Sequence, residues 1–113
     1  MKRGAAMSWL ILILAGLAEI TWAVALKYAD GFHNLVPSII TVVGYIASLL
    51  LLSAALNKLP LGTAYAVWTG IGIIGTTVLG IVLFREQLTL LQGIFILLIV
   101  VGIVGLKLTG SNS

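Results

Sequence analysis

The chain has 113 residues, of which 61% are hydrophobic and only 8% are charged, against roughly 25% charged residues in an average soluble domain. This composition excludes an ordinary soluble fold. The net charge is +3 without a basic run that would indicate nucleic-acid binding, and the absence of cysteine removes disulfides and thiolate metal sites.

Four apolar stretches follow one another, from Ser8 to Leu26, Leu35 to Leu56, Leu61 to Phe84 and Leu88 to Leu106. Each is close to the roughly 20 residues that a helix needs to span hydrocarbon, whereas membrane β-strands would need only about 9 to 11. We therefore predict an all-α membrane protein, a single domain over residues 1–113 with four transmembrane helices. Because no loop could hold a second domain, the function must lie within or beside the bilayer. We expect neither an enzyme nor a cofactor.

The first stretch follows Met1-Lys2-Arg3 and superficially resembles a secretory signal, but it continues to Leu26 and three spans follow, so we interpret it as a helix. Near its middle lies Glu19, the single acid at membrane depth, with no Lys, Arg or His at comparable depth. A charge at the bilayer centre costs about 2.5 to 3.5 kcal/mol on insertion scales. Glu19 must therefore be protonated or be paired with a cation that is not part of the chain.

A carboxyl group that can hold a proton or a cation has the chemistry required for proton-coupled cation exchange. The alternative is a structural hydrogen bond between helices, although ionisable residues inside membranes are functional by default. Trp22 lies at i+3 on the same helix face, while the small residues Gly16 and Ala15 allow another helix to approach. Since Trp22 lies well inside the span, we favour a binding role for its ring over an interfacial anchor.

The second and third stretches contribute further candidates. Ser48 is informative only as a partner for Glu19, because serine in such helices commonly bonds to its own backbone. The third stretch carries Tyr65 and Trp68 at i, i+3; an indole face attracts a cation, and a phenol can donate to a carboxylate. Near mid-span, the paired glycines Gly70 and Gly72 indicate either close packing or a bend.

The fourth stretch has no polar side chain between Gln92 and Lys107, so it cannot line a cation site. Its small residues, Gly93, Gly102 and Gly105, favour a role in helix association. A bundle of four such short helices is also too thin to surround a path through its interior. We therefore expect an oligomer, minimally a dimer that shares two copies of Glu19.

Basic residues in short loops set membrane orientation, and here they are nearly balanced. With four spans, both termini share one side, which carries four basic residues: Lys2, Arg3, Lys58 and Lys107. The opposite side carries Lys27 and Arg85, and a start at Met7 would make the count two against two. We predict that the chain inserts in both orientations.

These residues resemble the small multidrug resistance family of bacterial proton-coupled exporters, from Met7 to about Leu108. The resemblance rests on Ala18-Glu19, on Lys27-Tyr28 with Asp30-Gly31-Phe32, on Pro37-Ser38, and above all on the run from Pro60 to Gly72. It implies an antiparallel, dual-topology homodimer in the bacterial inner membrane, with both copies of Glu19 shared between protons and one cationic substrate. It also implies a bend of the third helix at Gly70 and Gly72 and dimer contacts along the fourth, where Gly102 fits the pattern and Phe95 departs from it.

The family divides into guanidinium exporters and promiscuous exporters of quaternary ammonium and aromatic cations. The chain resembles the guanidinium subtype in the spacing of Glu19 and Trp22, in Trp68-Thr69-Gly70-Ile71-Gly72, and in Phe84-Arg85-Glu86, whereas Tyr45 is more typical of the promiscuous branch. The binding residues that this resemblance implies are Glu19, Trp22, Ser48, Tyr65 and Trp68. Guanidinium, a planar cation with N–H donors around its edge, suits a carboxylate between indoles. The other hypotheses are a promiscuous exporter and a passive accessory subunit.

Overall fold

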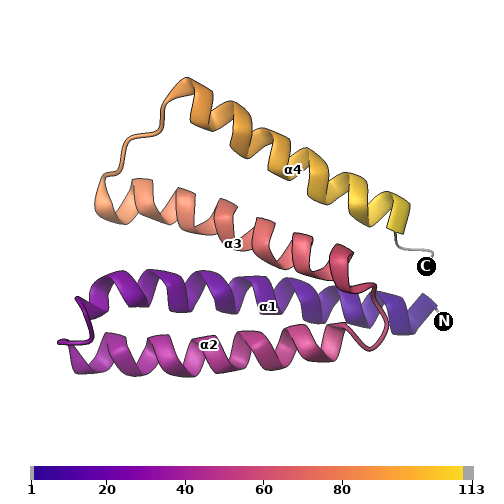
Figure 1. Ribbon diagram of the computed structural model, residues 1–113, viewed down its shortest axis with the longest axis horizontal. Coiled ribbons are helices and arrows are strands. Elements are labelled where there is room, and N and C mark those ends of the chain that lie inside the picture. Colours follow the sequence, from indigo (N-terminus) through magenta and orange to yellow (C-terminus); the bar gives the residue numbers. More distant parts are fainter. Residues whose placement is uncertain (1, 111–113) are drawn as a thin grey trace.

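The computed structural model describes residues 2–110, and this part of the chain folds into four α-helices (Figure 1). They are α1 (Lys2–Ala29), α2 (Leu35–Ala55), α3 (Leu61–Phe84) and α4 (Leu90–Gly110). Each contains a segment of 20 to 24 residues that is long and apolar enough to cross a membrane. For the described residues, the prediction of an all-α chain with four membrane helices is confirmed.

Two helices are longer than hydropathy alone predicts. α1 begins before Ser8 and continues past Leu26, because Lys27 can remain helical while its ammonium group reaches the polar layer. The helix ends where residues 30–32 adopt positive φ angles of 50°, 68° and 68°. At its other end, α4 runs past the predicted Leu106 to Gly110.

α4 begins at Leu90 rather than at the predicted Leu88, because a capping box precedes it. The Thr89 hydroxyl accepts a hydrogen bond from the backbone N–H of Gln92 at 3.1 Å, and the Gln92 side-chain oxygen accepts one from the N–H of Thr89 at 3.0 Å. This reciprocal pair satisfies two backbone donors that the first turn would otherwise leave free. The signal is local and polar, so a hydropathy argument misses it.

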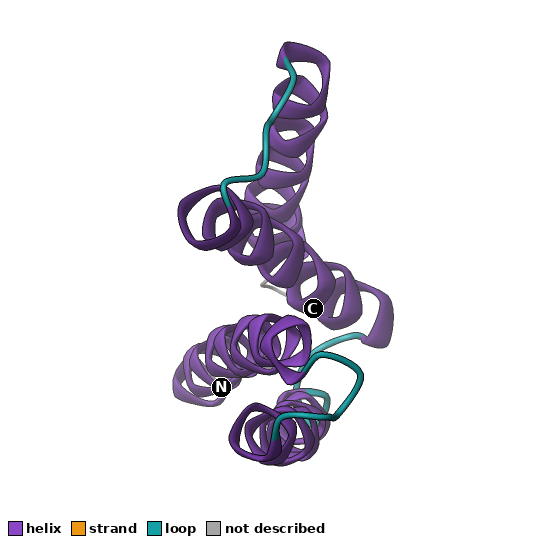
Figure 2. Ribbon diagram, turned by 90° about the vertical axis from the view of Figure 1, so that its left-hand side faces the viewer, coloured by secondary structure: helices purple, strands orange, loops and turns teal. Residues whose placement is uncertain are grey.

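The helices run up and down in sequence, and the order in which they pack decides what surrounds Glu19. α1 packs closely against α2 and, on another side, against α3. α4 packs along α3 and reaches α1 through Lys107, whose ammonium group lies 5.4 Å from the centroid of the Trp9 ring. Figure 2 shows the α3–α4 pair above the α1–α2 pair. The two chain ends and the α2–α3 connection lie at one end of the bundle, and the other two connections lie opposite, as expected for four spans (Figure 1).

The buried core lies between α1, α2 and α3, toward the end of the bundle that carries the chain termini. Its largest contributors are Trp9 and Leu12 from α1, Leu52 from α2, and Val67 and Trp68 from α3. The first apolar stretch, which superficially resembles a secretory signal, thus forms a helix that contributes to the buried core. By contrast, none of the described side chains of α4 is buried.

Candidate cation-binding site

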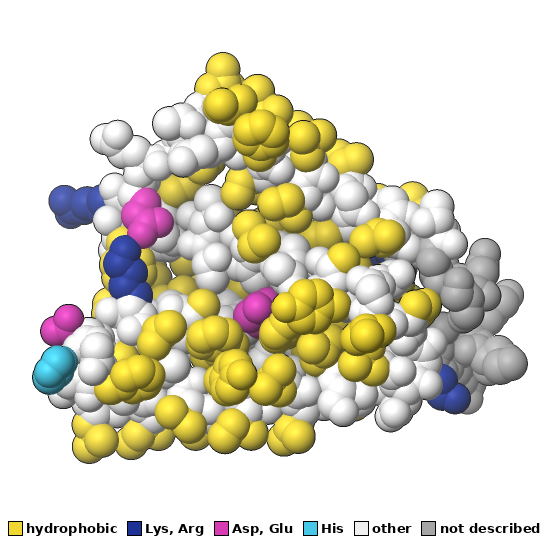
Figure 3. Space-filling view, viewed as in Figure 1, with side chains coloured by type: hydrophobic (Ala, Val, Ile, Leu, Met, Phe, Trp, Pro, Cys, Tyr) yellow, Lys and Arg dark blue, Asp and Glu magenta, His cyan; other side chains and the backbone are white. Residues whose placement is uncertain are grey.

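Glu19 lies on the face of α1 that contacts α3, and its carboxyl group rests against the backbone of Gly72. A Cβ atom at position 72 would stand 2.6 Å from Glu19 Cδ and 3.2 Å from Cγ, closer than side chains can pack. The carboxyl group therefore occupies space that only a glycine leaves open. Figure 3 shows an acidic patch in the middle of an otherwise apolar face, between the charged ends of the bundle; Glu19 is the only Asp or Glu within a span.

One carboxylate oxygen of Glu19 has no partner. Oε1 is buried and makes no hydrogen bond to any described residue. A buried polar atom without a partner is uncommon in folded proteins and demands an explanation such as a bound ion. The nearest described basic side chain on the same helix is Lys27, two turns away, and its ammonium group is bound elsewhere. Within the described chain, Oε1 of Glu19 is therefore a buried acceptor without a donor.

Gly70 and Gly72 face different neighbours, although they are only two residues apart. Gly72 contacts Glu19 of α1, whereas a Cβ atom at Gly70 would meet the side chains of Ile99 and Ile103 of α4. α3 is a continuous helix through both positions. The two glycines thus allow α3 to lie close to α1 on one side and to α4 on the other.

Ser48 is fully buried, and its partners are not the ones expected from the sequence. Its hydroxyl donates to the backbone oxygen of Ala15 at 2.8 Å and accepts a hydrogen bond from Trp68 Nε1 at 2.8 Å. In the described chain Ser48 does not bond to Glu19. Ala15 lies one turn before Glu19, so its carbonyl is also the helical acceptor of the Glu19 N–H. The Trp68–Ser48–Ala15 chain of hydrogen bonds therefore anchors the turn of α1 that carries the acid.

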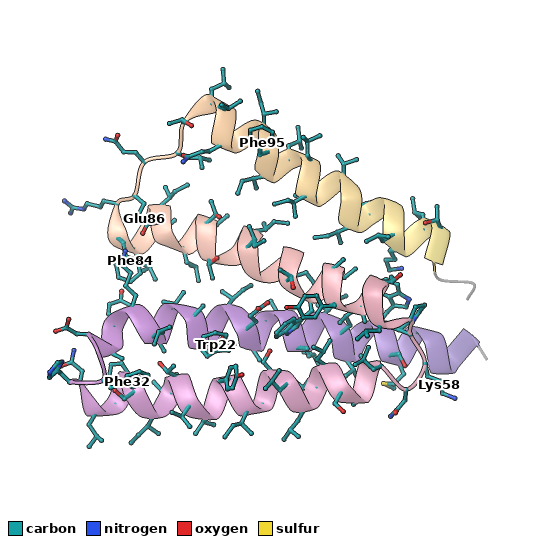
Figure 4. All side chains as sticks on the ribbon, in the orientation of Figure 1. Trp22, Phe32, Lys58, Phe84, Glu86 and Phe95 are labelled. Carbon is teal, nitrogen blue, oxygen red and sulfur yellow. The ribbon has the colours of Figure 1, made fainter. Side chains whose placement is uncertain are left out.

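Trp22 faces α2 and packs edge-on against Tyr45, with 5.2 Å between the ring centroids (Figure 4). The backbone and Cβ of Trp22 lie close to Gly44, where an added Cβ atom would stand 2.9 Å from Trp22 Cβ. The indole Nε1 is buried and has no hydrogen-bond partner among the described residues. An unpaired donor on Trp22 and an unpaired acceptor on Glu19 thus lie one turn apart on α1.

Tyr65 lies on the exposed side of α3 and stacks obliquely on Trp68, with the ring centroids 5.4 Å apart at an interplanar angle of 50°. Its side chain is 54% exposed, and its hydroxyl takes part in no hydrogen bond within the described residues. Among the predicted residues, the structure therefore pairs Glu19 with Gly72, and it groups Ser48, Tyr65 and Trp68 around the indole of α3. It leaves Trp22 on the α2 side of α1.

Sequence reasoning missed a cluster at the end of the bundle that holds the α1–α2 and α3–α4 connections. Lys27 Nζ donates to Glu86 Oε2 at 2.8 Å and lies 4.5 Å from the centroid of the Phe84 ring. Both charged side chains are about half exposed, and exposed ion pairs contribute only about 0.2 to 1 kcal/mol. The residues are 59 positions apart, and nothing in the sequence pattern joins them.

These observations define a class of protein, a small multi-pass membrane protein with one unpaired acid between its helices. The family described as Small Multidrug Resistance protein matches residues 7–99. The chain belongs to this family. The resemblance noted from the sequence is confirmed.

Several curated relatives carry one name. The chain is 56% identical to the guanidinium exporter of Yersinia pseudotuberculosis serotype I (strain IP32953) over 102 residues, which cover 90% of this chain and 98% of the relative. It is 54% identical to the guanidinium exporter of Escherichia coli (strain K12) over 103 residues, which cover 91% and 98%. It is also 54% identical to that of Proteus vulgaris, over 90% and 98% of the two chains.

Proposed function

We propose that this chain exports guanidinium ion across the bacterial inner membrane in exchange for protons. The observation that carries the proposal is the buried Oε1 of Glu19, a carboxylate oxygen at membrane depth with no partner in the described chain. The relatives named guanidinium exporter, at about 55% identity over nearly their whole length, support guanidinium over bulkier cations. A helical rather than a β-barrel span suits the inner membrane.

The chemistry of guanidinium suits Glu19 and the aromatic side chains of α1 and α3. It can give two parallel N–H bonds to one carboxylate, as an arginine side chain does, and its faces can stack on an indole. We propose that Glu19 binds the cation, that Trp22 and Trp68 offer their ring faces, and that Tyr65 supplies a hydroxyl at the exposed side of α3. Ser48 acts through the backbone of α1, because its own hydroxyl donates to Ala15.

Proton coupling follows if one carboxyl group serves both ions. A bound guanidinium balances the charge of the Glu19 carboxylate, and so does a proton, but the two cannot occupy the same oxygens together. Because a bare carboxylate is costly at membrane depth, each ion leaves when the other replaces it. Glu19 is the only Asp or Glu within a span, so no other carboxyl group at that depth is available for either ion.

The homodimer is part of the proposal, and α4 supports it. Positions that a Cβ atom would take at Gly102 and Gly105 have no non-neighbouring atom within 4 Å, so this side of α4 is free to receive another helix. The near-balance of basic residues on the two sides favours an antiparallel pair. Gly70 and Gly72, with α1 and α4 on either side, are then where α3 would bend as the dimer changes the side to which it opens.

Uptake of labelled guanidinium into proteoliposomes under a pH gradient tests the function. The wild-type chain should accumulate guanidinium when protons move the other way, and Glu19→Gln should not. A bulky quaternary ammonium compound should be a poor substrate; preferential transport of that compound would favour a promiscuous exporter. Undiminished uptake by Glu19→Gln would instead favour a passive accessory role and contradict the proposal.

A further inference from the structure

A crevice of about 320 Å³ lies between α1 and α3 and is lined in part by the last turns of both helices. These turns lie at the end of the bundle opposite the chain termini (Figure 1). Its lining includes Ala23 and Lys27 from α1, Thr76 and Phe84 from α3, and Glu86 from the following loop. Figure 4 shows Phe84 and Glu86 together at this end of α3, next to the end of α1. The crevice therefore combines a carboxylate, an aromatic face and hydroxyl groups.

The ammonium group of Lys27 occupies a cation position within this cluster. It is 2.8 Å from Glu86 Oε2 and 4.5 Å from the centroid of the Phe84 ring, so a carboxylate and a π-face both contact one positive charge. Guanidinium uses the same two partners better than ammonium does. Its planar edge matches a carboxylate with two hydrogen bonds, and its face can lie on an aromatic ring.

Glu86 is held in place by the end of α3. Its N–H donates to the backbone oxygen of Gly80 at 3.2 Å, across the left-handed residue Arg85, which ends the helix. A Cβ atom at position 80 would stand 3.0 Å from Glu86 Cδ, so the carboxyl group lies back over the last turn of α3. The backbone of Glu86 is therefore held by α3. Both charged side chains are about half exposed, and Lys27 is the longer of the two, so its ammonium group can swing away from the carboxylate.

The faces of α1 and α3 that line the crevice continue toward Glu19. On α1, Ala23 lies four residues from both Glu19 and Lys27, and on α3, Thr76 lies four residues from both Gly72 and Gly80, so each set follows one helix face. The Thr76 hydroxyl donates to the backbone oxygen of Gly72 at 2.7 Å. The distance from Glu19 to Lys27 along α1 is about 12 Å.

We propose that Phe84 and Glu86 form an outer binding site for guanidinium, which Lys27 fills with its own ammonium group when no substrate is present. This inference rests on the proposed guanidinium transport. A guanidinium ion displaces the lysine, is held between the carboxylate and the ring, and then moves along the α1–α3 crevice to Glu19. Lys27 is thus an intramolecular competitor of the substrate.

The Michaelis constant for guanidinium uptake into proteoliposomes tests this site. Lys27→Gln removes the competitor and should lower KM, whereas Glu86→Gln and Phe84→Leu weaken the site and should raise it. Each change should be about two- to fivefold, the range that one exposed ion pair or ring contact represents, and kcat should change less. Arg85→Gln is the matched control, because it removes one positive charge from the same side of the membrane and should leave KM unchanged.

Opposite shifts for Lys27→Gln and Glu86→Gln support the outer site, because a purely structural ion pair would be lost equally in both. Equal shifts in one direction, or KM values indistinguishable from Arg85→Gln, would overturn it while leaving guanidinium transport by the wild type intact. If Glu86→Gln does not fold, the opposite shifts of Lys27→Gln and Phe84→Leu decide in the same way. A wild-type chain that transports no guanidinium would overturn the proposed function itself and the outer site with it.

Discussion

Gly72→Ala perturbs the candidate site with the least change elsewhere, because Gly72 is where the Glu19 carboxyl group meets α3. A Cβ atom there would stand 2.6 Å from Glu19 Cδ, whereas non-bonded carbon atoms pack at about 3.5 to 4.0 Å. The carboxyl group must therefore move by about 1 Å. The Glu19 side chain is flexible and only partly buried, so the movement itself costs little folding free energy.

The expected result is a loss of transport without a matching loss of stability. Alanine gains about 1 kcal/mol of helix propensity over glycine, which offsets the cost of displacing Glu19. A displacement of 1 Å at a reacting group can cost about 10²-fold in rate, and we expect the initial rate of guanidinium uptake to fall at least about tenfold. Uptake is measured in proteoliposomes, and stability by thermal unfolding of the purified protein in detergent.

Gly16→Ala is the matched control on the facing helix. Its Cβ atom would stand 2.9 Å from Ile71 Cβ, an atom next to the backbone of α3 that cannot move away alone. Overpacking of this kind costs typically about 1 to 3 kcal/mol, so Gly16→Ala should lower the unfolding temperature, whereas Gly72→Ala should lower the rate of uptake. Wild-type uptake by Gly72→Ala, or a loss of uptake that only follows the loss of folded protein, would refute the assigned contact between Gly72 and Glu19.

Three further predictions concern the acid, the buried network and the dimer. Glu19→Asp keeps the charge but shortens the side chain, so it should retain proton-coupled exchange at a lower rate; a rate as low as that of Glu19→Gln would contradict the shared-carboxylate mechanism. Ser48→Ala leaves Trp68 Nε1 without its acceptor and should cost about 1 to 3 kcal/mol of unfolding free energy; adding Trp68→Phe should cost less than it does in the wild type, and strictly additive losses would exclude the bond. Gly102→Leu fills the open side of α4 and should reduce dimer cross-linking in membranes, whereas the exposed Val104→Leu should not; equal cross-linking would place the dimer contact elsewhere.

The helices and the acid were accessible from the sequence, for physical reasons. An apolar stretch of about 20 residues is readily predicted to be a membrane-spanning helix. An acidic residue within such a helix is costly, so it is readily predicted to be functional. The end of α1 and the start of α4 were harder to predict. α1 continues through Lys27 beyond the hydrocarbon, and the Thr89–Gln92 capping box makes α4 begin two residues later than hydropathy predicts.

The contacts between helices could not be predicted, because periodicity gives the faces of each helix but not the register between helices. Ser48 and Trp68 were both candidates, yet only the packing of α2 against α1 and α3 reveals that they bond to each other and to Ala15. The same holds for Gly72, whose nearest neighbour from another helix is Glu19. The Lys27–Glu86 pair joins the last turn of α1 to the segment after α3, and no helical spacing relates the two residues.

The central claim is that Glu19 holds either a proton or guanidinium. It is tested most directly by measuring proton release when guanidinium is added to the purified protein in weakly buffered detergent solution. We expect protons to be released on binding, at a pH where Glu19 is protonated in the free protein, and Glu19→Gln to release none. Guanidinium binding without proton release at every pH tested, or equal release from Glu19→Gln, would contradict the account.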